Sequence, residues 1–408
     1  MAAFGLDGRK ESYRFNGDEA SATAGRAILN APFDSQNALP AVSRHISAVY
    51  AEFLLPISKA LEVTLSGRAD QYSGFGRTYN PKASFRYAPL KSLMLRGSYS
   101  TGFRVPSFNQ LFNGVTDQAY GGKDLADPGT CPGLKVDSTK PGCESINPNI
   151  LSGGKSDLGP EKSKQASVGM VWEPGNFSLN MDLWKICKTD VISSLDEQTL
   201  LANYALFQSS FIRDGSGKLI FIDERWLNSG DAITRGLEVG LRTHGKAMGG
   251  KWSSGIEGSY LIKKIDRPLP NAPFGPGQVG VYSIIGDLGL RWKHTAYVSF
   301  STGPWSTVVQ NVFRSGYADQ VLPGVANAIV TPSNYSPNVK AYSIFNASVS
   351  YNGIKNLTLT AGVKNLLNTD PPFSVTYDSN SGAGSSWEPR VADPGGRSLT
   401  LRANYKFL

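Results

Sequence analysis

Alternation between apolar and polar side chains with a period of two residues is the feature that most limits how this sequence can fold. In the C-terminal segment SLTLRANYKF, Leu399 and Leu401 share one face, whereas Thr400 and Arg402 share the other. Successive side chains of a β-strand point to opposite faces, so this pattern predicts a strand whose two faces meet different surroundings. Strong helical periodicity is hard to find, and the sequence therefore predicts an all-β fold.

About fourteen segments show the same alternation. Each is close to the roughly 9–11 residues that a tilted strand needs to cross a bilayer. The segments are 3–15, 44–57, 60–72, 79–88, 92–104, 164–174, 177–189, 231–243, 250–264, 290–302, 304–317, 339–352, 356–369 and 396–408.

The gaps between these segments alternate between long and short. Short gaps carry turn residues, as in PLKS at 89–92 and TGP at 302–304. The long gaps are 16–43, 73–78, 105–163, 190–230, 265–289, 318–338 and 370–395. Transmembrane barrels have this rhythm, with long external loops and short periplasmic turns. A soluble all-β protein is the alternative, but it leaves the rhythm unexplained. The sequence therefore predicts an antiparallel transmembrane β-barrel.

The composition agrees with a barrel. Charged residues make up 18% of the chain, 41 basic against 33 acidic residues give a formal charge of +8, and the mean hydropathy is -0.23. Half of each barrel strand faces a polar lumen, so such values are expected. No apolar run approaches the roughly 18 residues of a membrane helix. MAAFGLDGRKESYRF lacks a signal-peptide pattern, so the chain is expected to lack its own start if it is exported.

Several motifs resemble those of TonB-dependent outer-membrane receptors. GVKNLLNTDPPFS (362–374) is similar to the end of the family's penultimate strand. Further matches follow the family's order and cover most of the chain from about residue 60. They are NPKASFRYAPLKSLMLRGSYSTGFRVPSFNQLF (80–112), LGPEKSKQASVGMVWEPGNFSLNMDLWKI (158–186), TRGLEVGLR (234–242) and RSLTLRANYKF (397–407).

The resemblance implies a barrel of about 22 strands with a plugged lumen, of which this chain holds about the last fourteen. Residues 1–408 are then expected to be the C-terminal part of the barrel domain, without the plug domain, the TonB box or the signal peptide. The TonB complex would be reached only through that missing plug. The barrel assembly machinery would bind the last strand, where Phe407 keeps the register before Leu408. An open sheet leaves two unpaired edges, which favours a piece of a longer or split protein over a smaller closed barrel.

Two of the three cysteines, Cys131 and Cys143, lie in the loop DPGTCPGLKVDSTKPGCES. We expect a local disulfide, which would stabilise the loop by about 3 kcal/mol and imply an oxidising compartment. Two free cysteines are the alternative. The three histidines, His45, His244 and His294, are far apart in sequence, so neither a zinc site nor another metal site is expected.

Alternation places a set of basic residues on the face predicted to line the lumen. They are Arg68, Lys82, Arg86, Arg96, Arg242, Lys364, Arg402 and Lys406. One reading is an electropositive path for an anionic ligand such as a ferric siderophore. The other is that these residues bind a plug or pair across the barrel wall, and it is favoured because any barrel interior is polar. Basic residues are dispersed along the chain, so no nucleic-acid partner is expected.

The long external loops are the better candidates for ligand capture. The longest, 105–163, carries the cysteine pair, and 370–395 carries Phe373, Tyr377 and Trp387. These aromatic residues either contact a ligand or pack into a loop core, and the sequence does not separate the two. The acidic pair Asp223–Glu224 lies in a predicted loop hairpin and is expected to be solvated.

The sequence contains no catalytic motif, so no enzyme activity and no cofactor are expected. The predicted function is that of an outer-membrane receptor, here as a fragment, which takes up a scarce nutrient such as a ferric siderophore, cobalamin or a carbohydrate. Outer-membrane lipid and a small external nutrient are the expected partners. One alternative is a stand-alone passive channel of about fourteen strands. A barrel-based enzyme is another, and it would need a Ser/His/Asp cluster at one rim.

Overall fold

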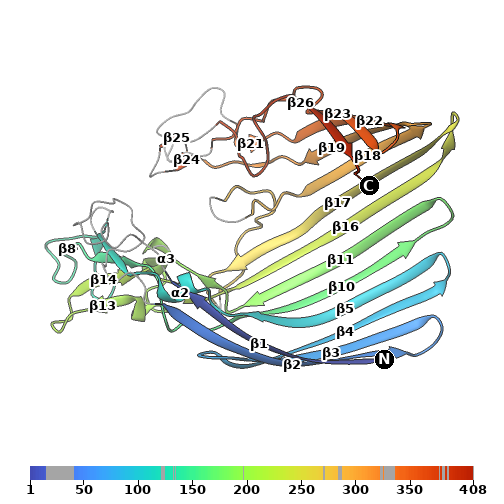
Figure 1. The fold of residues 1–408 in the computed structure, drawn as a ribbon. Helices are drawn as coiled ribbons and strands as arrows, with labels where there is room; N and C mark the ends of the chain where they lie inside the picture. The colour runs from blue at the N-terminus through green and yellow to red at the C-terminus, as the bar shows by residue number, and fades with distance from the viewer. Residues whose placement is uncertain are drawn as a thin grey trace.

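The computed structural model contains one antiparallel sheet of fourteen long strands, which curves into an open trough (Figure 1). Neighbours in the sheet follow one another along the chain. The strands are β1 (Ala2–Tyr13), β2 (Val42–Pro56), β3 (Leu61–Tyr72), β4 (Gly76–Leu90), β5 (Leu93–Arg104), β10 (Glu161–Trp172), β11 (Phe177–Thr189), β16 (Asp231–Ala247), β17 (Gly250–Arg267), β18 (Trp292–Thr302), β19 (Trp305–Arg314), β22 (Tyr342–Ile354), β23 (Leu357–Lys364) and β26 (Ser398–Tyr405).

The structure describes every residue except a set of loop residues and the last residue. The undescribed residues are 15–40, 121–124, 132, 134, 196, 270–271, 284–286, 322–324, 326–335, 376, 379–381, 384–385 and 408. The predicted long gap 16–43 lies almost wholly outside the described part.

Each of the fourteen predicted segments corresponds to one strand of the sheet, which confirms the predicted fold class. Within the described part of the chain, β1 pairs only with β2 and β26 only with β23, so these two strands form the edges of the sheet. The long connections gather at one end of the trough, and most of the short turns and both chain termini lie at the other (Figure 1).

The prediction of a long connection at 73–78 was wrong. β3 ends at Tyr72 and β4 begins at Gly76, so only three residues join the two strands. Gly74 and Gly76 have φ angles of 86° and 73°, which allow the chain to reverse within a tight turn. The N–H of Phe75 donates to the carbonyl of Tyr72 at 3.2 Å and closes that turn.

The register gives the sheet one apolar face, here called the outer face. Cross-strand partners lie on the same face, so a row of partners shows what that face presents. One such row crosses nine strands and contains Leu55, Val63, Phe85, Gly97, Val168, Leu183, Leu237, Tyr260 and Trp292. Val168 and Leu183 nevertheless expose 54% and 43% of their surface. Exposed apolar rows of this kind are typical of the lipid-facing side of a barrel.

The opposite face, here called the inner face, is polar. The row one residue further along crosses the same region and contains Glu62, Arg86, Arg96, Gly169, Asp182, Glu238, Ser259, Lys293 and Arg314. Long connections fold over this face: Arg44 of β2 donates to the carbonyl of Pro106, and its guanidinium lies over the ring of Phe108. The inner face is therefore the side that the loops cover.

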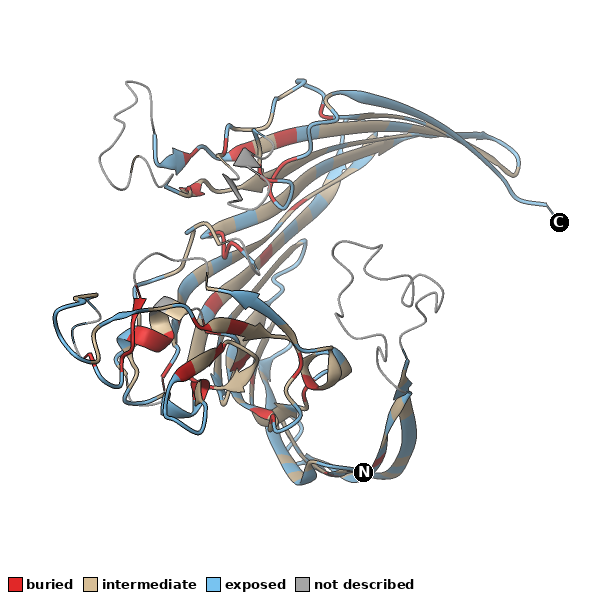
Figure 2. Ribbon diagram, turned by 90° about the vertical axis from the view of Figure 1, so that its left-hand side faces the viewer, coloured by how far each residue is buried: buried red, intermediate tan, exposed pale blue. Residues whose placement is uncertain are grey.

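Most fully buried side chains lie in the long connections rather than in the sheet (Figure 2). Connections 105–160 and 190–230 fold together into a unit here called the first cap. Its buried apolar cluster includes Ile150, Leu200 and Ile222. The elements of the first cap are α2 (Phe108–Phe112), β6 (Thr116–Ala119), β7 (Leu125–Ala126), β8 (Ser145–Ile146), β9 (Asn149–Ser152), β12 (Ile192–Ser193), α3 (Glu197–Ala202), η1 (Gln208–Ser210), β13 (Phe211–Arg213), β14 (Leu219–Asp223) and β15 (Leu227–Asn228).

Connections 268–291, 315–341 and 365–397 form a second unit, here called the second cap. Its buried cluster joins Leu288, Val339 and Val391 to Tyr342 and Ile344 at the start of β22. The short strands of the second cap are β20 (Tyr317–Ala318), β21 (Asn338–Val339), β24 (Tyr377–Asp378) and β25 (Gly382–Ala383). Among the described residues, no helix is long and apolar enough to span a membrane.

The NLLN segment ends β23 and turns the chain into the second cap. Asn365 and Asn368 have φ angles of 51° and 53°, a left-handed conformation that asparagine tolerates better than most residues. The Asn365 side chain, which is only 2% exposed, donates to the carbonyl of Thr369 at 2.9 Å and accepts from its N–H at 2.8 Å. Asn368 accepts from the N–H of Arg397 at 2.9 Å. The two asparagines therefore fix the start and the end of this connection.

Substitution of Asn365 should destabilise the second cap. Two different substitutions separate the contribution of the side-chain hydrogen bonds from that of backbone strain. Asn365→Gly removes both hydrogen bonds but accepts the positive φ, and we expect a loss of about 1–3 kcal/mol. Asn365→Ala adds about 1 kcal/mol of strain to that loss. Protease cleavage of connection 365–397 in the folded protein measures both variants. Equal cleavage of the wild type and the glycine variant would contradict the role of the side chain.

Candidate functional site

The inner face is lined by ion pairs rather than by free positive charge. Arg86 and Arg96 are direct cross-strand partners, an unfavourable arrangement for like charges. Each has an acidic neighbour: Arg86 lies 3.8 Å from Glu62, and Arg96 donates from Nε and Nη2 to the two carboxylate oxygens of Asp182. The row is therefore nearly neutral as a whole.

Gly169 makes the Arg96–Asp182 pair possible. Arg96 belongs to β5 and Asp182 to β11, and Gly169 of β10 lies between them in the register. A Cβ atom at Gly169 would lie 2.1 Å from Oδ1 of Asp182, so any side chain there would displace the carboxylate. The missing side chain lets the guanidinium reach across β10.

Arg68 holds a second group of charges on the inner face near β1. Its guanidinium donates to Asp7 and to Asp70, each at 2.8 Å, and lies 5.9 Å from the ring centre of Tyr50. Arg9 approaches Asp7 at 3.4 Å. Asp70 is only 4% exposed, so its charge depends on the partner arginine.

The register places the predicted basic residues of the strands on the inner face, and five of the predicted eight make ion pairs. Besides the arginines already described, Arg242 pairs with Glu257, and Lys364 pairs with Asp393 of the second cap. Arg402 donates to Asn404 at 3.2 Å. Within the described residues, no ion pair is seen for Lys82, Arg402 or Lys406, and Lys406 follows the end of β26.

The predicted loop aromatic residues lie in different surroundings. Phe373 is 71% exposed at the surface of the second cap. Trp387 is half-buried beside Glu388, which is itself buried. The backbone of Tyr377 lies in β24, and its side chain falls outside the described part of the structure. Of the two described side chains, that of Phe373 is therefore the more open to a ligand.

A bidentate ion pair and a disulfide hold the first cap together. Arg213 of β13 donates to both carboxylate oxygens of Asp127 at 2.6 Å, and the N–H of Gly129 donates to the same carboxylate at 2.8 Å. Four residues after Asp127, Cys131 is bonded to Cys143 with the two Cα atoms 5.0 Å apart. The Arg213–Asp127 pair joins the two connections that build the first cap, and the disulfide closes a loop within the first of them. The hydrogen bonds from Arg213 hold the pKa of Asp127 below its usual range, against the opposing effect of burial.

The expectation that Asp223 is solvated was wrong. It ends β14, which pairs in parallel with β9 of the other connection, and the residue is only 4% exposed. Burial alone would raise the pKa of Asp223, but hydrogen bonds from Arg225 outweigh it and the pKa is lowered. Lys155 approaches the same carboxylate at 3.9 Å. Sequence reasoning missed this site because the pairing of β14 with β9 joins residues about seventy positions apart.

A buried chain of hydroxyl groups anchors the second cap. The hydroxyl of Tyr317 donates to Ser374 at 2.9 Å, and Ser374 donates to Asp319 at 3.1 Å. Ser374 has no exposed surface, and burial raises the pKa of Tyr317 to about 12. These bonds fix the PPFS segment, which follows NLLN, to β20. The three side chains are buried, so they present no reactive group at the surface.

The three histidines do not come together. His45 lies near the loop end of β2, His244 near the turn end of β16, and His294 on β18, where it contacts Trp292 and Asn311. Among the described residues, no group of His, Cys, Asp and Glu could hold a metal ion.

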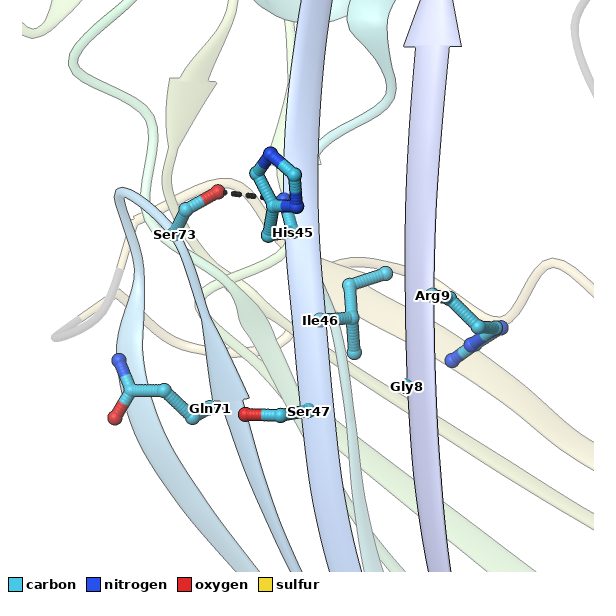
Figure 3. Close-up of a pocket in the computed structure, with 7 residues that line it drawn as sticks. All are labelled: Gly8, Arg9, His45, Ile46, Ser47, Gln71 and Ser73. Atoms are coloured by element: carbon cyan, nitrogen blue, oxygen red, sulfur yellow. Dashed lines mark hydrogen bonds between the residues drawn. The ribbon is translucent and has the colours of Figure 1, made fainter.

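One open groove of about 570 Å³ lies on β1 to β3, and both polar residues and Ile46 line it (Figure 3). Gly8, Ser47 and Gln71 are cross-strand partners two residues beyond Leu6, Val49 and Ala69, so they belong to the outer face. The N–H of His45 donates to the hydroxyl of Ser73 at 2.9 Å. Arg9 and Ile46, which also line the groove, are cross-strand partners on the inner face.

Comparison with known protein families identifies the family to which this sheet, with its apolar and polar faces, belongs. A family model described as TonB dependent receptor-like, beta-barrel, matches residues 3–366. The chain belongs to this family. Members of the family are outer-membrane receptors and transporters. No curated protein matches the sequence.

Solved structures of TonB-dependent receptors share the fold of the whole chain. A ferric enterobactin receptor mutant from Pseudomonas aeruginosa (PfeA), in complex with enterobactin, is 15% identical with a TM-score of 0.66. The siderophore receptor PirA from Acinetobacter baumannii is 16% identical with a TM-score of 0.62, and the FrpB iron transporter from Neisseria meningitidis is 13% identical with a TM-score of 0.58. All three matches cover 100% of this chain and 51–52% of the solved chain, so this chain spans about half their length.

Loss of the Asp182 charge should leave Arg96 facing Arg86 without the carboxylate that pairs with Arg96. We expect Asp182→Asn to lower the temperature at which the folded barrel loses its compact mobility on a gel, with a larger effect at low salt. Arg96 is 44% exposed, so the loss should stay within about 1 kcal/mol. Glu257→Gln, which breaks the more exposed pair with Arg242, is the matched control and should change less. An equal effect in both variants at every salt concentration would contradict this account.

Acid should destabilise the first cap by protonating Asp127. Because the folded pKa of Asp127 lies below the unfolded value of about 3.9, its stabilising effect is complete above that value and is lost as the pH falls through the folded pKa. We expect protease cleavage of connection 105–160 to increase below about pH 4. Asp127→Asn should raise cleavage already at neutral pH, whereas Asp157→Asn, at an exposed position of the same connection, should not. Cleavage of Asp127→Asn at the wild-type rate would contradict the role of this pair.

Proposed function

We propose that residues 1–408 form the C-terminal part of the barrel domain of an outer-membrane receptor that takes up a scarce nutrient by TonB-dependent transport. The observation that supports this most is the arrangement of the sheet: an apolar outer face, a polar inner face, and caps at one end only. Such a wall separates lipid from an aqueous interior and presents folded loops to the outside. The chain's own role in this proposal is binding and passage, without catalysis.

The ligand that fits this interior is small and anionic, such as a ferric siderophore. Five of the eight predicted basic residues already have acidic partners, so Lys82, Arg402 and Lys406 are the three of that set left to attract it. Phe373 offers an exposed aromatic surface on the second cap for first contact, and Tyr377 and Trp387 belong to the same connection. The solved neighbours named as siderophore receptors or iron transporters support this ligand class over cobalamin or a carbohydrate.

Uptake measurements in living cells test the proposal. The whole reading frame that contains residues 1–408 is deleted and restored, and uptake of iron-55 is measured as a tris-catecholate complex and as ferric citrate, with labelled cobalamin in parallel. We expect uptake of one iron complex to require both the frame and a functional TonB protein. Uptake that requires the frame but continues without TonB would show a passive channel and contradict the proposal, as would no change for any probe.

A second arm of the same experiment tests the second cap. Phe373→Ala should raise the ligand concentration needed for half-maximal uptake, because it removes an exposed aromatic contact. Leu206→Ala, at a 66% exposed position of the first cap, is the matched control. Equal behaviour of both variants would remove Phe373 from the binding surface.

A further inference from the structure

Four basic side chains form an unusual group on the outer face of the sheet. Lys185 of β11 is the cross-strand partner of Arg235 of β16, and Arg235 is the partner of Lys263 of β17. Lys164 of β10 pairs with Cys187, two residues from Lys185, and so lies diagonally beside it. These four residues, Lys164, Lys185, Arg235 and Lys263, are here called the basic quartet. Like charges in direct cross-strand positions are unfavourable unless an anion joins them.

The register fixes the face on which the quartet lies. Lys185 is two residues from Leu183, and Arg235 is two residues from Leu237, so both share the face of the exposed apolar row. A bulge at Arg235 and Gly236 places Lys263 opposite Arg235 on that same face. All four side chains are exposed. The quartet therefore points away from the interior of the trough.

The position along the strands is equally defined. β11 ends at Thr189 and β16 begins at Asp231, so the quartet lies toward the end that carries the long connections. Two residues of a strand span about 7 Å, which is the distance from the quartet to the apolar row. On the same face of β11, Leu183, Met181, Leu179 and Phe177 run without a charge toward the turn end. The quartet thus marks the external border of the apolar band.

Acidic side chains close to the quartet are already paired with other cations. Asp231 pairs with Arg267, and Asp190 lies 3.1 Å from Lys162. Among the described residues, no ion pair or hydrogen bond is seen for the four quartet side chains. On the inner face, by contrast, the adjacent arginines Arg86 and Arg96 each have a carboxylate. The quartet, unlike that pair of arginines, has no acidic partner among the described residues.

We propose that the basic quartet binds the phosphate groups of an anionic glycolipid in the outer leaflet of the membrane. The acyl chains of that lipid cover the apolar row that contains Val168 and Leu183, and its phosphates bridge the quartet side chains. Charge complementarity and the direct continuity of the quartet with the apolar band favour a membrane lipid over a soluble anion or a protein. The inference rests on outer-membrane placement and not on the identity of the transported nutrient.

Lipid binding by the purified, intact receptor tests the inference. The probes are bis-phosphorylated lipid A and lipid A from which both phosphates have been removed, each titrated into the detergent-solubilised protein and followed by native mass spectrometry. We expect the wild type to prefer the phosphorylated form by tenfold or more, because each basic residue contributes substantially to binding of an anionic lipid. The double variant that carries both Lys185→Gln and Arg235→Gln should lose that preference.

The matched control removes the same charge elsewhere. Lys246 and Lys251 are also cross-strand partners, but they lie at the turn end of β16 and β17. Lys246→Gln with Lys251→Gln should keep the preference for phosphorylated lipid A. The exchange Lys185→Arg with Arg235→Lys preserves charge and should bind like the wild type, which separates loss of the site from loss of folding. The mobility of the folded barrel on a gel verifies that every variant is folded.

Three results would overturn the inference. The first is equal binding of both lipid forms by the wild type, and the second is an equal loss of preference in the quartet variant and the control. The third is full competition by inorganic phosphate at low millimolar concentration, which would show a soluble-anion site without a contribution from lipid. Nutrient uptake is a separate readout, so failure of the transport proposal leaves these results interpretable.

Discussion

Fourteen consecutive strands satisfy one another's backbone N–H and C=O groups through antiparallel ladders, and this pairing also decides which side chains share a face. A shift of one residue in any ladder would move its apolar side chains to the inner face and its charges to the outer face. The Arg96–Asp182 pair across Gly169 and the apolar row through Val168 are thus two results of one register. Membrane insertion, ion pairing and loop placement all depend on it.

The long connections at the ends of the strands are stabilised in a different way. Long connections must fold without the sheet's ladders, and here they do so as two caps with their own buried clusters. In the first cap, the β9–β14 pairing and the Asp127–Arg213 pair tie together two connections that lie far apart in sequence. In the second, Asn365 fixes the start of connection 365–397, and Ser374 joins that connection to connection 315–341. The long connections are thereby folded units rather than isolated loops.

The sequence predicts the strands well because each carries its own period of two, as segment 177–189 shows by matching β11 at both ends. Predicted strand 356–369 instead ends at Lys364, because alternation does not register the left-handed turn at Asn365. Sequence also predicts the face of residues such as Arg68 and Arg96. It does not predict their partners, since Asp7 and Asp182 depend on the order and register of neighbouring strands. Buried Asp223 was missed for the same reason.

The central claim is that one face of the sheet meets lipid and the other meets water. Single spin labels at residues 177–189 of β11, in protein reconstituted into a bilayer, test it most directly. The native Cys187 is replaced in every variant that carries its label at another position. The account predicts that oxygen, which partitions into lipid, relaxes labels at 179, 181 and 183, whereas a water-soluble nickel complex relaxes labels at 178, 180 and 182. Accessibility without this two-residue alternation would contradict the account.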